Sequence, residues 1–160
     1  MARHIMKGIV VDDDQDDLDV FLKAAKSIEN KIDLICFQGG EQVLDFLDHN
    51  KFIPDFIFLD INMPMMDGQE CLKKIRQRWH QNERCVIMYS TSNNRREIKR
   101  CYELGANAFM QKPHSFPKLK YMLQQIFNKD WSKPCENLSE LDFILSPEDL
   151  IKEPLNPAKL

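Results

Sequence analysis

The sequence predicts an α/β fold in which helices cover both faces of a parallel β-sheet. Five short apolar runs, rich in β-branched or aromatic residues, alternate with five stretches of helical periodicity. This alternation is typical of parallel strands joined by right-handed helical crossovers. A chain of 160 residues is long enough for one domain with a proper core and a short appendage.

The amino-terminal half supplies three of the strands. Residues 8–11 form a short apolar strand, and from Leu18 apolar side chains recur at helical spacing. A second strand is expected over residues 32–37, and a short helix over residues 41–48. The third strand has four large apolar residues at positions 56–59, a run typical of a strand buried on both faces.

The carboxyl-terminal half continues the alternation. Strands are expected over residues 86–89 and 108–111, and helices over residues 68–79, 95–104 and 116–128. Beyond Lys129 the composition shifts to prolines and scattered charge around one apolar island at residues 141–145. We therefore expect a folded domain over residues 5–128 and a tail over residues 129–160 that is too short for a second domain.

Composition argues against several classes of protein. The net charge of −3 gives no reason to expect general affinity for nucleic acid. The five cysteines form no C-x-x-C pair, which favours reduced thiols over a disulfide framework or a zinc site. No apolar run approaches the roughly 20 residues that span a membrane, and the start of the chain has no signal-peptide pattern. We therefore expect a cytoplasmic protein.

Polar residues follow four of the five predicted strands. These residues are the acids at 12–14, Asp60, Ser90 and Lys112. Because the carboxyl ends of parallel strands share one edge of the sheet, where ligands bind, we expect these side chains to converge. Carboxylates suit Mg²⁺, and a lysine beside a hydroxyl suits the oxygens of a phosphoryl group. Asp60 is then a candidate nucleophile, since aspartyl phosphates are known covalent intermediates.

Each of these residues has a simpler explanation when it is taken alone. Asp60 would cap a strand–loop junction, Ser90 would be an ordinary hydroxyl at a strand end, and Lys112 would be a solvated surface lysine. Five acids within residues 12–17 would also repel one another unless a cation or water screened them. The joint placement of all these groups at one edge argues for a chemical site.

Four segments resemble the receiver domain of response regulators in two-component signalling. They are V-D-D-D at 11–14, F-L-D-I-N-M-P-M-M-D-G at 58–68, S-T-S at 90–92 and L-G-A-N-A-F-M-Q-K-P at 104–113. The resemblance covers about residues 5–128. It implies a flavodoxin-like, doubly wound (βα)5 three-layer sandwich with strand order 2-1-3-4-5. The D-W followed by a late F-I-L is similar to stand-alone receivers of the Bacteroidetes type.

The resemblance implies a single-domain response regulator. Such a protein accepts a phosphoryl group on Asp60 from a sensor histidine kinase or a histidine phosphotransfer protein, with Mg²⁺ as cofactor. It signals to a downstream protein, which the sequence does not name, through a conformational switch and protein–protein contacts. It is not an enzyme beyond its own phosphorylation and dephosphorylation. The tail shows no helix-turn-helix, so no DNA-binding output domain is expected. No membrane partner is expected either, since no apolar run is long enough to span one, and a homodimer is an alternative.

The same matching assigns the metal ligands. Asp12 and Asp13 are the acidic pair, and Asp13 binds Mg²⁺ directly. Asp60 supplies a second ligand and the backbone carbonyl of Asn62 supplies a third. A further acid at Asp14 leaves a 13/14 register as an alternative, although the length of the first strand favours 12/13.

The remaining roles concern the phosphoryl group and the switch. Lys112 pairs with the phosphoryl oxygens and forms the catalytic pair with Asp60. Ser90 is the switch hydroxyl, and Phe109 is the switch aromatic, which is expected to turn inward after phosphorylation. On the surface, Val20 lies away from the buried face of the first helix and is a candidate contact for the kinase.

Two other readings remain open. A haloacid-dehalogenase-like phosphatase also uses an aspartyl phosphate and Mg²⁺, and Asp12-x-Asp14 nominally fits its D-x-D motif. Asp16 then stands where that motif needs Thr or Val, and Asp60 would have no role. The second reading is a receiver-like interaction module that is not phosphorylated.

The prolines and scattered charge of the tail favour a disordered segment. Its apolar residues favour burial instead, because an indole at Trp131 and the four aliphatic or aromatic side chains of residues 141–145 would together contribute several kcal/mol if buried. If they are buried, Trp131 and Phe143 are the residues of interest. We expect both to pack against the end of the last helix and its neighbour, the first helix. Pairing of the island with a second copy of the chain is the alternative.

Overall fold

A computed structural model describes residues 5–28, 32–128 and 143–145. Five helices and six strands alternate in this part of the chain. The elements are β1 (Met6–Val11), α1 (Gln15–Lys26), β2 (Ile32–Phe37), α2 (Gly40–His49), β3 (Phe56–Asp60), α3 (Gly68–Arg78), β4 (Val86–Ser90), α4 (Arg95–Glu103), β5 (Ala108–Gln111), α5 (Phe116–Phe127) and β6 (Ile144–Leu145).

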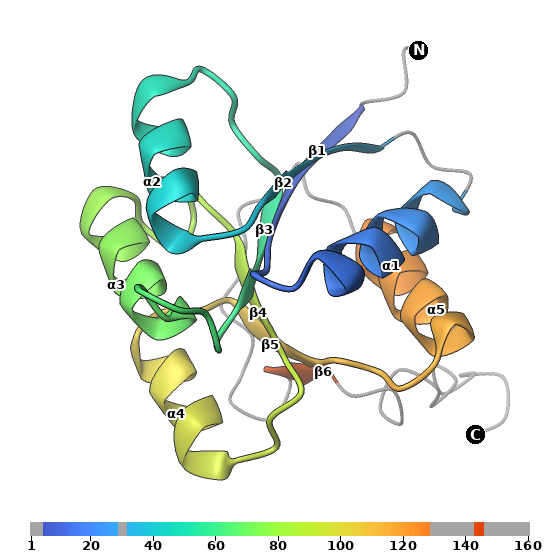
Figure 1. The fold of residues 1–160 in the computed structure, drawn as a ribbon. Coiled ribbons are helices and arrows are strands. Elements are labelled where there is room, and N and C mark those ends of the chain that lie inside the picture. Colours follow the sequence, from blue (N-terminus) through green and yellow to red (C-terminus); the bar gives the residue numbers. More distant parts are fainter. Residues whose placement is uncertain (1–4, 29–31, 129–142, 146–160) are drawn as a thin grey trace, which may run out of the picture.

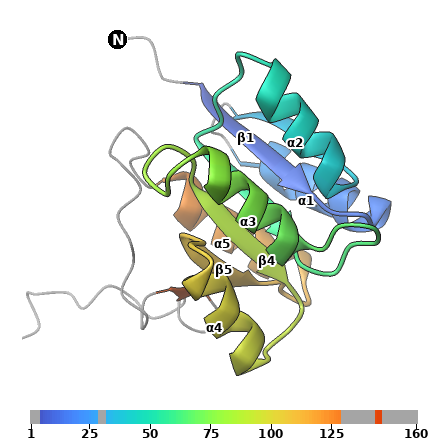
Figure 2. The ribbon, with the colours of Figure 1, turned by 90° about the vertical axis from the view of Figure 1, so that its left-hand side faces the viewer.

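The sheet is parallel throughout and its strands lie in the order β2-β1-β3-β4-β5-β6. Helices α2, α3 and α4 cover one face, and α1 and α5 cover the other (Figure 1). Figure 2 looks onto the face that carries α2, α3 and α4. The predicted doubly wound (βα)5 sandwich is confirmed, and β6 extends its sheet by one strand beyond β5.

The central strand β3 is buried on both faces, as its apolar run predicted. Phe56, Ile57, Phe58 and Leu59 are all fully buried. Side chains alternate across a strand, so Ile57 and Leu59 enter the core under α2, α3 and α4, whereas Phe56 and Phe58 enter the core under α1 and α5. Because all four apolar residues are held in the two cores, β3 is fixed in the sheet, and this places Asp60 at its carboxyl end.

Four of the five helices begin at a polar side chain that accepts hydrogen bonds from the first backbone amides. For α1 this cap is Asp14, whose Oδ1 accepts from the amides of Asp16 at 2.9 Å and Asp17 at 3.3 Å. Asp67, Asn94 and Ser115 cap α3, α4 and α5 in the same way. The cap explains why α1 begins at Gln15, ahead of the first apolar residue of the helical pattern.

Strand β6 covers the edge of β5 that would otherwise be free. The amide of Phe109 donates to the carbonyl of Phe143 at 2.8 Å, and the ring of Phe143 is 5.2 Å from that of Tyr102 on α4. The prediction that Phe143 packs between the first and last helices is wrong. An unpaired strand edge offers backbone hydrogen bonds as well as apolar contact, whereas α1 and α5 already pack against each other. Trp131 lies outside the described residues.

Two further observations bear on the expectations from composition. Cys36, Cys71, Cys85 and Cys101 are free thiols, and Cys135 lies outside the described residues. Within residues 5–28, 32–128 and 143–145, no helix has the length and apolar character needed to cross a membrane.

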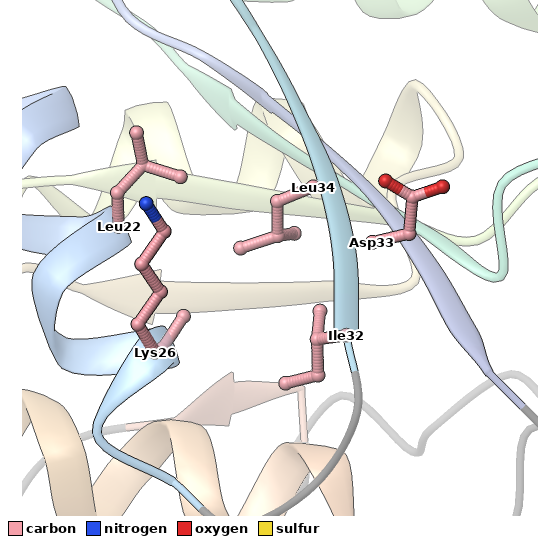
Figure 3. Close-up of a pocket in the computed structure, with 6 residues that line it drawn as sticks. Leu22, Lys26, Ile32, Asp33 and Leu34 are labelled. Atoms are coloured by element: carbon pink, nitrogen blue, oxygen red, sulfur yellow. The ribbon is translucent and has the colours of Figure 1, made fainter.

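A hollow of about 320 Å³ lies between α1 and the beginning of β2. Leu22 and Lys26 of α1 face Ile32 and Leu34 there, and Asp33 points to the other side of the strand (Figure 3). This hollow is at the amino ends of the strands. It is therefore separate from the edge at which the predicted site residues gather.

Phe143→Ala is expected to destabilise the folded domain by roughly 3 kcal/mol, because it removes a fully buried ring and leaves a cavity. Ile144→Ala, at the next residue of the chain, is the matched control, since Ile144 is 38% exposed, and should cost well under half as much. Urea unfolding of the three proteins measures both changes. Equal effects of the two substitutions would show that the ring of Phe143 does not anchor β6.

Candidate functional site

The predicted site residues lie at the carboxyl ends of their strands. Asp12 directly follows β1, Asp60 is the last residue of β3, Ser90 is the last residue of β4, and Lys112 directly follows β5. Neighbouring strands are in register there, with Asp60 opposite Tyr89. The parallel sheet therefore brings two carboxylates, a hydroxyl and an ammonium, all distant from one another in the sequence, to one edge.

Three carboxylates form a group at this edge. Oxygen atoms of Asp12, Asp13 and Asp60 lie within 4.8 Å of one another. Asp12 and Asp60 are almost fully buried, whereas Asp13 is exposed at the rim. The carboxylate of Asp14 is occupied in capping α1. The grouping of Asp12 and Asp13 with Asp60 is the arrangement that the 12/13 register predicts, and the register itself stays a prediction.

Lys112 is the cation among these acids. Its Nζ lies 2.6 Å from Asp12 Oδ2 and 2.8 Å from Asp17 Oδ2, but 3.6 Å from Asp60 Oδ1. The ammonium also lies 5.0 Å from the centre of the Tyr89 ring, within the range of a cation–π contact. Lys112 therefore compensates the negative charge of Asp12 and Asp17 within the acidic run.

Burial and charge set the protonation of the group. Burial raises the pKa of Asp60 to about 7, against the positive charge of Lys112, which lowers it. Burial also raises the pKa of Asp12, although the hydrogen bond from Lys112 opposes this shift. For Lys112, burial alone would lower the pKa, but the hydrogen bonds to Asp12 and Asp17 and the charge of Asp60 raise it overall. Lys112 is therefore firmly cationic, whereas Asp60 exchanges its proton near neutral pH.

The loop after Asp60 is held close to the strand end by a glycine. The amide of Gly68 donates to the carbonyl of Ile61 at 2.8 Å, and a Cβ at position 68 would lie only 2.0 Å from the carbonyl oxygen of Asp60. Met65 turns the loop in the left-handed backbone region, with a φ of 69°. Asn62 is exposed in this loop, beside the acids. The sequence P-M-M-D-G thus folds the chain back over Asp60.

Ser90 is fully buried, and its hydroxyl accepts from the amide of Ser92 at 3.1 Å. Its backbone carbonyl accepts from the amide of Lys112 at 2.8 Å. A backbone hydrogen bond therefore couples Ser90 to Lys112, so a displacement of one residue is expected to move the other.

Phe109 lies apart from the acids, in the core under α2, α3 and α4. Its side chain is already fully buried, and its amide is hydrogen-bonded to Phe143, the residue before β6. The ring is therefore already in an inward position, and the expected rotation from an exposed to a buried position does not apply to this conformation. The ring is buried because β6 pairs with β5 and Tyr102 packs against Phe143 there.

Sequence reasoning missed two contributors to the site, Asp17 and Tyr89. Both border a hollow of about 180 Å³ that opens beside Lys112 and extends to Val20 and Phe116. Nothing in the spacing of the acids distinguishes Asp17 from Asp16. Asp17 differs from Asp16 only in the folded chain, where it bonds to Lys112, which lies 95 residues further along the sequence.

The arrangement has two chemical capacities. A group of carboxylate oxygens with no nitrogen or sulfur ligand fits a hard divalent cation. A fixed ammonium beside a buried carboxylate fits the transfer of an anionic group to that carboxylate, because the ammonium compensates the incoming charge.

Comparisons with known proteins agree with this geometry. Residues 9–124 match the family model of the response regulator receiver domain. The Mn²⁺-bound form of response regulator Rcp1 is 26% identical with a TM-score of 0.68, over 84% of this chain and 97% of that one. The phosphorylated cyanobacterial phytochrome response regulator RcpA is 25% identical with a TM-score of 0.70, over 77% and 91%. Response regulator RPA3017, in red light signaling of R. palustris, is 26% identical with a TM-score of 0.68, over 76% and 91%.

The raised pKa of Asp60 predicts a pH-dependent cost to stability. The folded chain holds this proton up to about pH 7, whereas the unfolded chain releases it near pH 4, so the folded state loses stability as the pH rises between these values. Asp60→Asn removes this loss. The variant should exceed the wild type in free energy of unfolding by roughly 1 to 3 kcal/mol at pH 8.

The difference between the two proteins should shrink towards zero near pH 4. Urea unfolding without divalent cations at both pH values measures it. Asp19→Asn, a change at an exposed acid of α1, is the control and should alter stability little at either pH. A constant difference between Asp60→Asn and the wild type at pH 4 and pH 8 would contradict the assignment.

Proposed function

Because the chain belongs to the family of response regulator receiver domains, we propose that it accepts a phosphoryl group on Asp60. The observation that carries the proposal is the position of this carboxylate. Asp60 ends the central strand and is grouped with the carboxylates of Asp12 and Asp13, and the ammonium of Lys112 is 3.6 Å away. Asp60 is 5% exposed, and of the three grouped acids it is the one that ends a strand.

The transfer is a nucleophilic substitution at phosphorus. An ionised oxygen of Asp60 attacks the phosphorus and a new P–O bond forms while the bond to the donor breaks. For a phosphohistidine donor, the ring nitrogen leaves with the electron pair. For acetyl phosphate, acetate leaves in the same way. We propose a sensor histidine kinase or a histidine phosphotransfer protein as the donor in signalling.

Lys112 stabilises the negative charge on the phosphoryl oxygens through its ammonium. The residues that would hold Mg²⁺ are the carboxylates of Asp12, Asp13 and Asp60 together with the backbone carbonyl of Asn62. When bound there, the ion supplies charge neutralisation for the transferring oxygens. The hard, oxygen-only donor set supports this choice of metal.

Signalling is proposed to begin at Ser90. Its hydroxyl, which accepts from Ser92 here, would instead donate to a phosphoryl oxygen. Because the carbonyl of Ser90 is bonded to the amide of Lys112, this movement reaches β5 and the surroundings of Phe109. The bound phosphoryl group shifts the populations of two conformations in proportion to its differential contacts with them.

The hollow beside Lys112 supports a contact surface for the donor protein. Val20 on α1 is 45% exposed and Phe116 at the start of α5 is 37% exposed, and both border this hollow. Apolar side chains at the rim of a charged site are suited to docking a protein. We therefore propose that the kinase contacts Val20.

Asp60→Asn should abolish covalent labelling by acetyl phosphate, because a side-chain amide is not a competent nucleophile towards phosphorus. Wild-type protein should gain one phosphoryl group by intact mass in the presence of Mg²⁺, and none after treatment with a chelator. The Asp33→Asn variant, which changes an exposed acid at the far end of the sheet, should be labelled normally. A labelled Asp60→Asn protein would place the nucleophile elsewhere.

Asp13→Asn should weaken Mg²⁺ binding by at least about tenfold, since it removes a charged ligand of the ion. A titration of the metal followed by tryptophan fluorescence or calorimetry measures the change. Asp14→Asn is the matched control, because Asp14 caps α1 and is expected to affect the affinity far less. A larger loss with Asp14→Asn than with Asp13→Asn would favour the 13/14 register.

Val20→Asp should slow phosphoryl transfer from the cognate kinase by roughly tenfold, because it places a charge in an apolar contact. Labelling by acetyl phosphate should be unchanged, since Val20 does not touch the reacting groups. The two donors are compared on the same preparation. Equal losses from both donors would mean that the substitution disturbs the fold or the site itself.

A further inference from the structure

The first turn of α1 contributes a carboxylate that the receiver motifs quoted above do not include. Asp17 Oδ2 lies 2.8 Å from the ammonium of Lys112, closer than Asp60 Oδ1 at 3.6 Å. Asp12 Oδ2 is the other close neighbour, at 2.6 Å. In this conformation the lysine is hydrogen-bonded to Asp12 and Asp17 and stands off from Asp60.

We propose that Asp17 is a positioning residue that holds Lys112 in a resting place, away from the acceptor carboxylate. Phosphoryl transfer then requires Lys112 to exchange Asp17 for the oxygens of the phosphoryl group. This inference rests on the proposed function of Asp60. It adds that Asp17 competes with the phosphoryl oxygens for the ammonium of Lys112, and that this competition influences the rate of phosphorylation.

The position of Asp17 follows from the way in which α1 begins. Asp14 caps the helix and accepts hydrogen bonds from the amides of Asp16 and Asp17, which fixes the first turn. Asp16 is exposed to solvent, whereas Asp17 is partly buried, with 46% of its side chain exposed, and borders the hollow beside Lys112. Two adjacent acids of the same turn therefore differ in one respect that matters here, the contact with Lys112.

The side chain of Lys112 has little freedom except to change partners. It is only 11% exposed, and the ring of Tyr89 lies 5.0 Å from its ammonium. An ammonium donates three hydrogen bonds. Two of them are used by Asp12 and Asp17, and the contact with Asp60 is too long to be the third.

A phosphoryl group is the stronger partner. It carries close to two negative charges and three acceptor oxygens, whereas Asp17 offers one half-exposed carboxylate. Lys112 therefore transfers to the phosphoryl oxygens as the new bond forms. The contact with Asp17 is present before the reaction and lost during it, so this contact slows the reaction. Asp12, which is buried, keeps the lysine near Asp60 in both states.

The test compares Asp17→Asn with Asp16→Asn. Both substitutions remove one negative charge from the same helical turn, but Asp17→Asn alone removes a carboxylate that contacts Lys112. We expect Asp17→Asn to raise the initial rate of labelling by acetyl phosphate, at saturating Mg²⁺, by roughly three- to tenfold over Asp16→Asn. Asp16→Asn should lie within about twofold of the wild type. Intact mass measures the rates.

A second readout needs neither metal nor phosphoryl group. In metal-free protein, the hydrogen bonds to Asp12 and Asp17 should slow exchange of the Lys112 ammonium protons with water, and nitrogen-edited NMR observes this. Asp17→Ala, which removes the acceptor oxygen altogether, should accelerate that exchange by several-fold, and Asp16→Ala should not. Unchanged exchange in Asp17→Ala would show that the contact is absent in solution and would overturn the proposal.

The two readouts separate the inference from the function on which it rests. A wild-type protein that is never labelled would refute phosphorylation at Asp60, whereas the exchange measurement would still report on Lys112. Normal labelling of the wild type, with equal or slower labelling of Asp17→Asn than of Asp16→Asn, would overturn the role of Asp17 and leave the acceptor in place.

Discussion

The edge of the sheet depends on one ion pair network, the contact of the Lys112 ammonium with the carboxylates of Asp12, Asp17 and Asp60. Buried carboxylates repel one another and lose their hydration, so they require a cation beside them. The fold supplies it because all strands end at one edge of the sheet, so that Lys112, directly after β5, extends past the end of β4 to the acids that follow or end β1 and β3. The cap at Asp14 and the folded-back loop at Gly68 then hold the acids around the lysine.

Much of this could be predicted from the sequence, and for identifiable reasons. The run at residues 56–59 is typical of a doubly buried strand, and parallel strands place their carboxyl ends together, so the convergence of Asp60 with Lys112 could be expected from the pattern. Asp17 could not be predicted, because five acids in six positions look alike until a partner selects among them. The same limit applies to Phe143, whose burial depends on an open strand edge that only the assembled sheet defines.

Strand β6 changes what the region around Phe109 can do. The ring is buried, its amide is bonded to the carbonyl of Phe143, and Phe143 contacts Tyr102 on α4. A conformational change that starts at Ser90 and reaches β5 therefore occurs beside an edge of the sheet that β6 already covers. Any response there has to alter the packing of α4, β5 and β6 together, since a close-packed core does not deform one side chain at a time.

The central claim is that Asp60 receives the phosphoryl group, and locating the modified residue tests it most directly. Borohydride reduces an aspartyl phosphate to homoserine, which peptide sequencing by mass spectrometry can place. After acetyl phosphate treatment of the native chain, homoserine is expected at position 60, within the tryptic peptide of residues 52–73. Homoserine at an acid of residues 8–23, where Asp12 and Asp13 lie, would contradict the account.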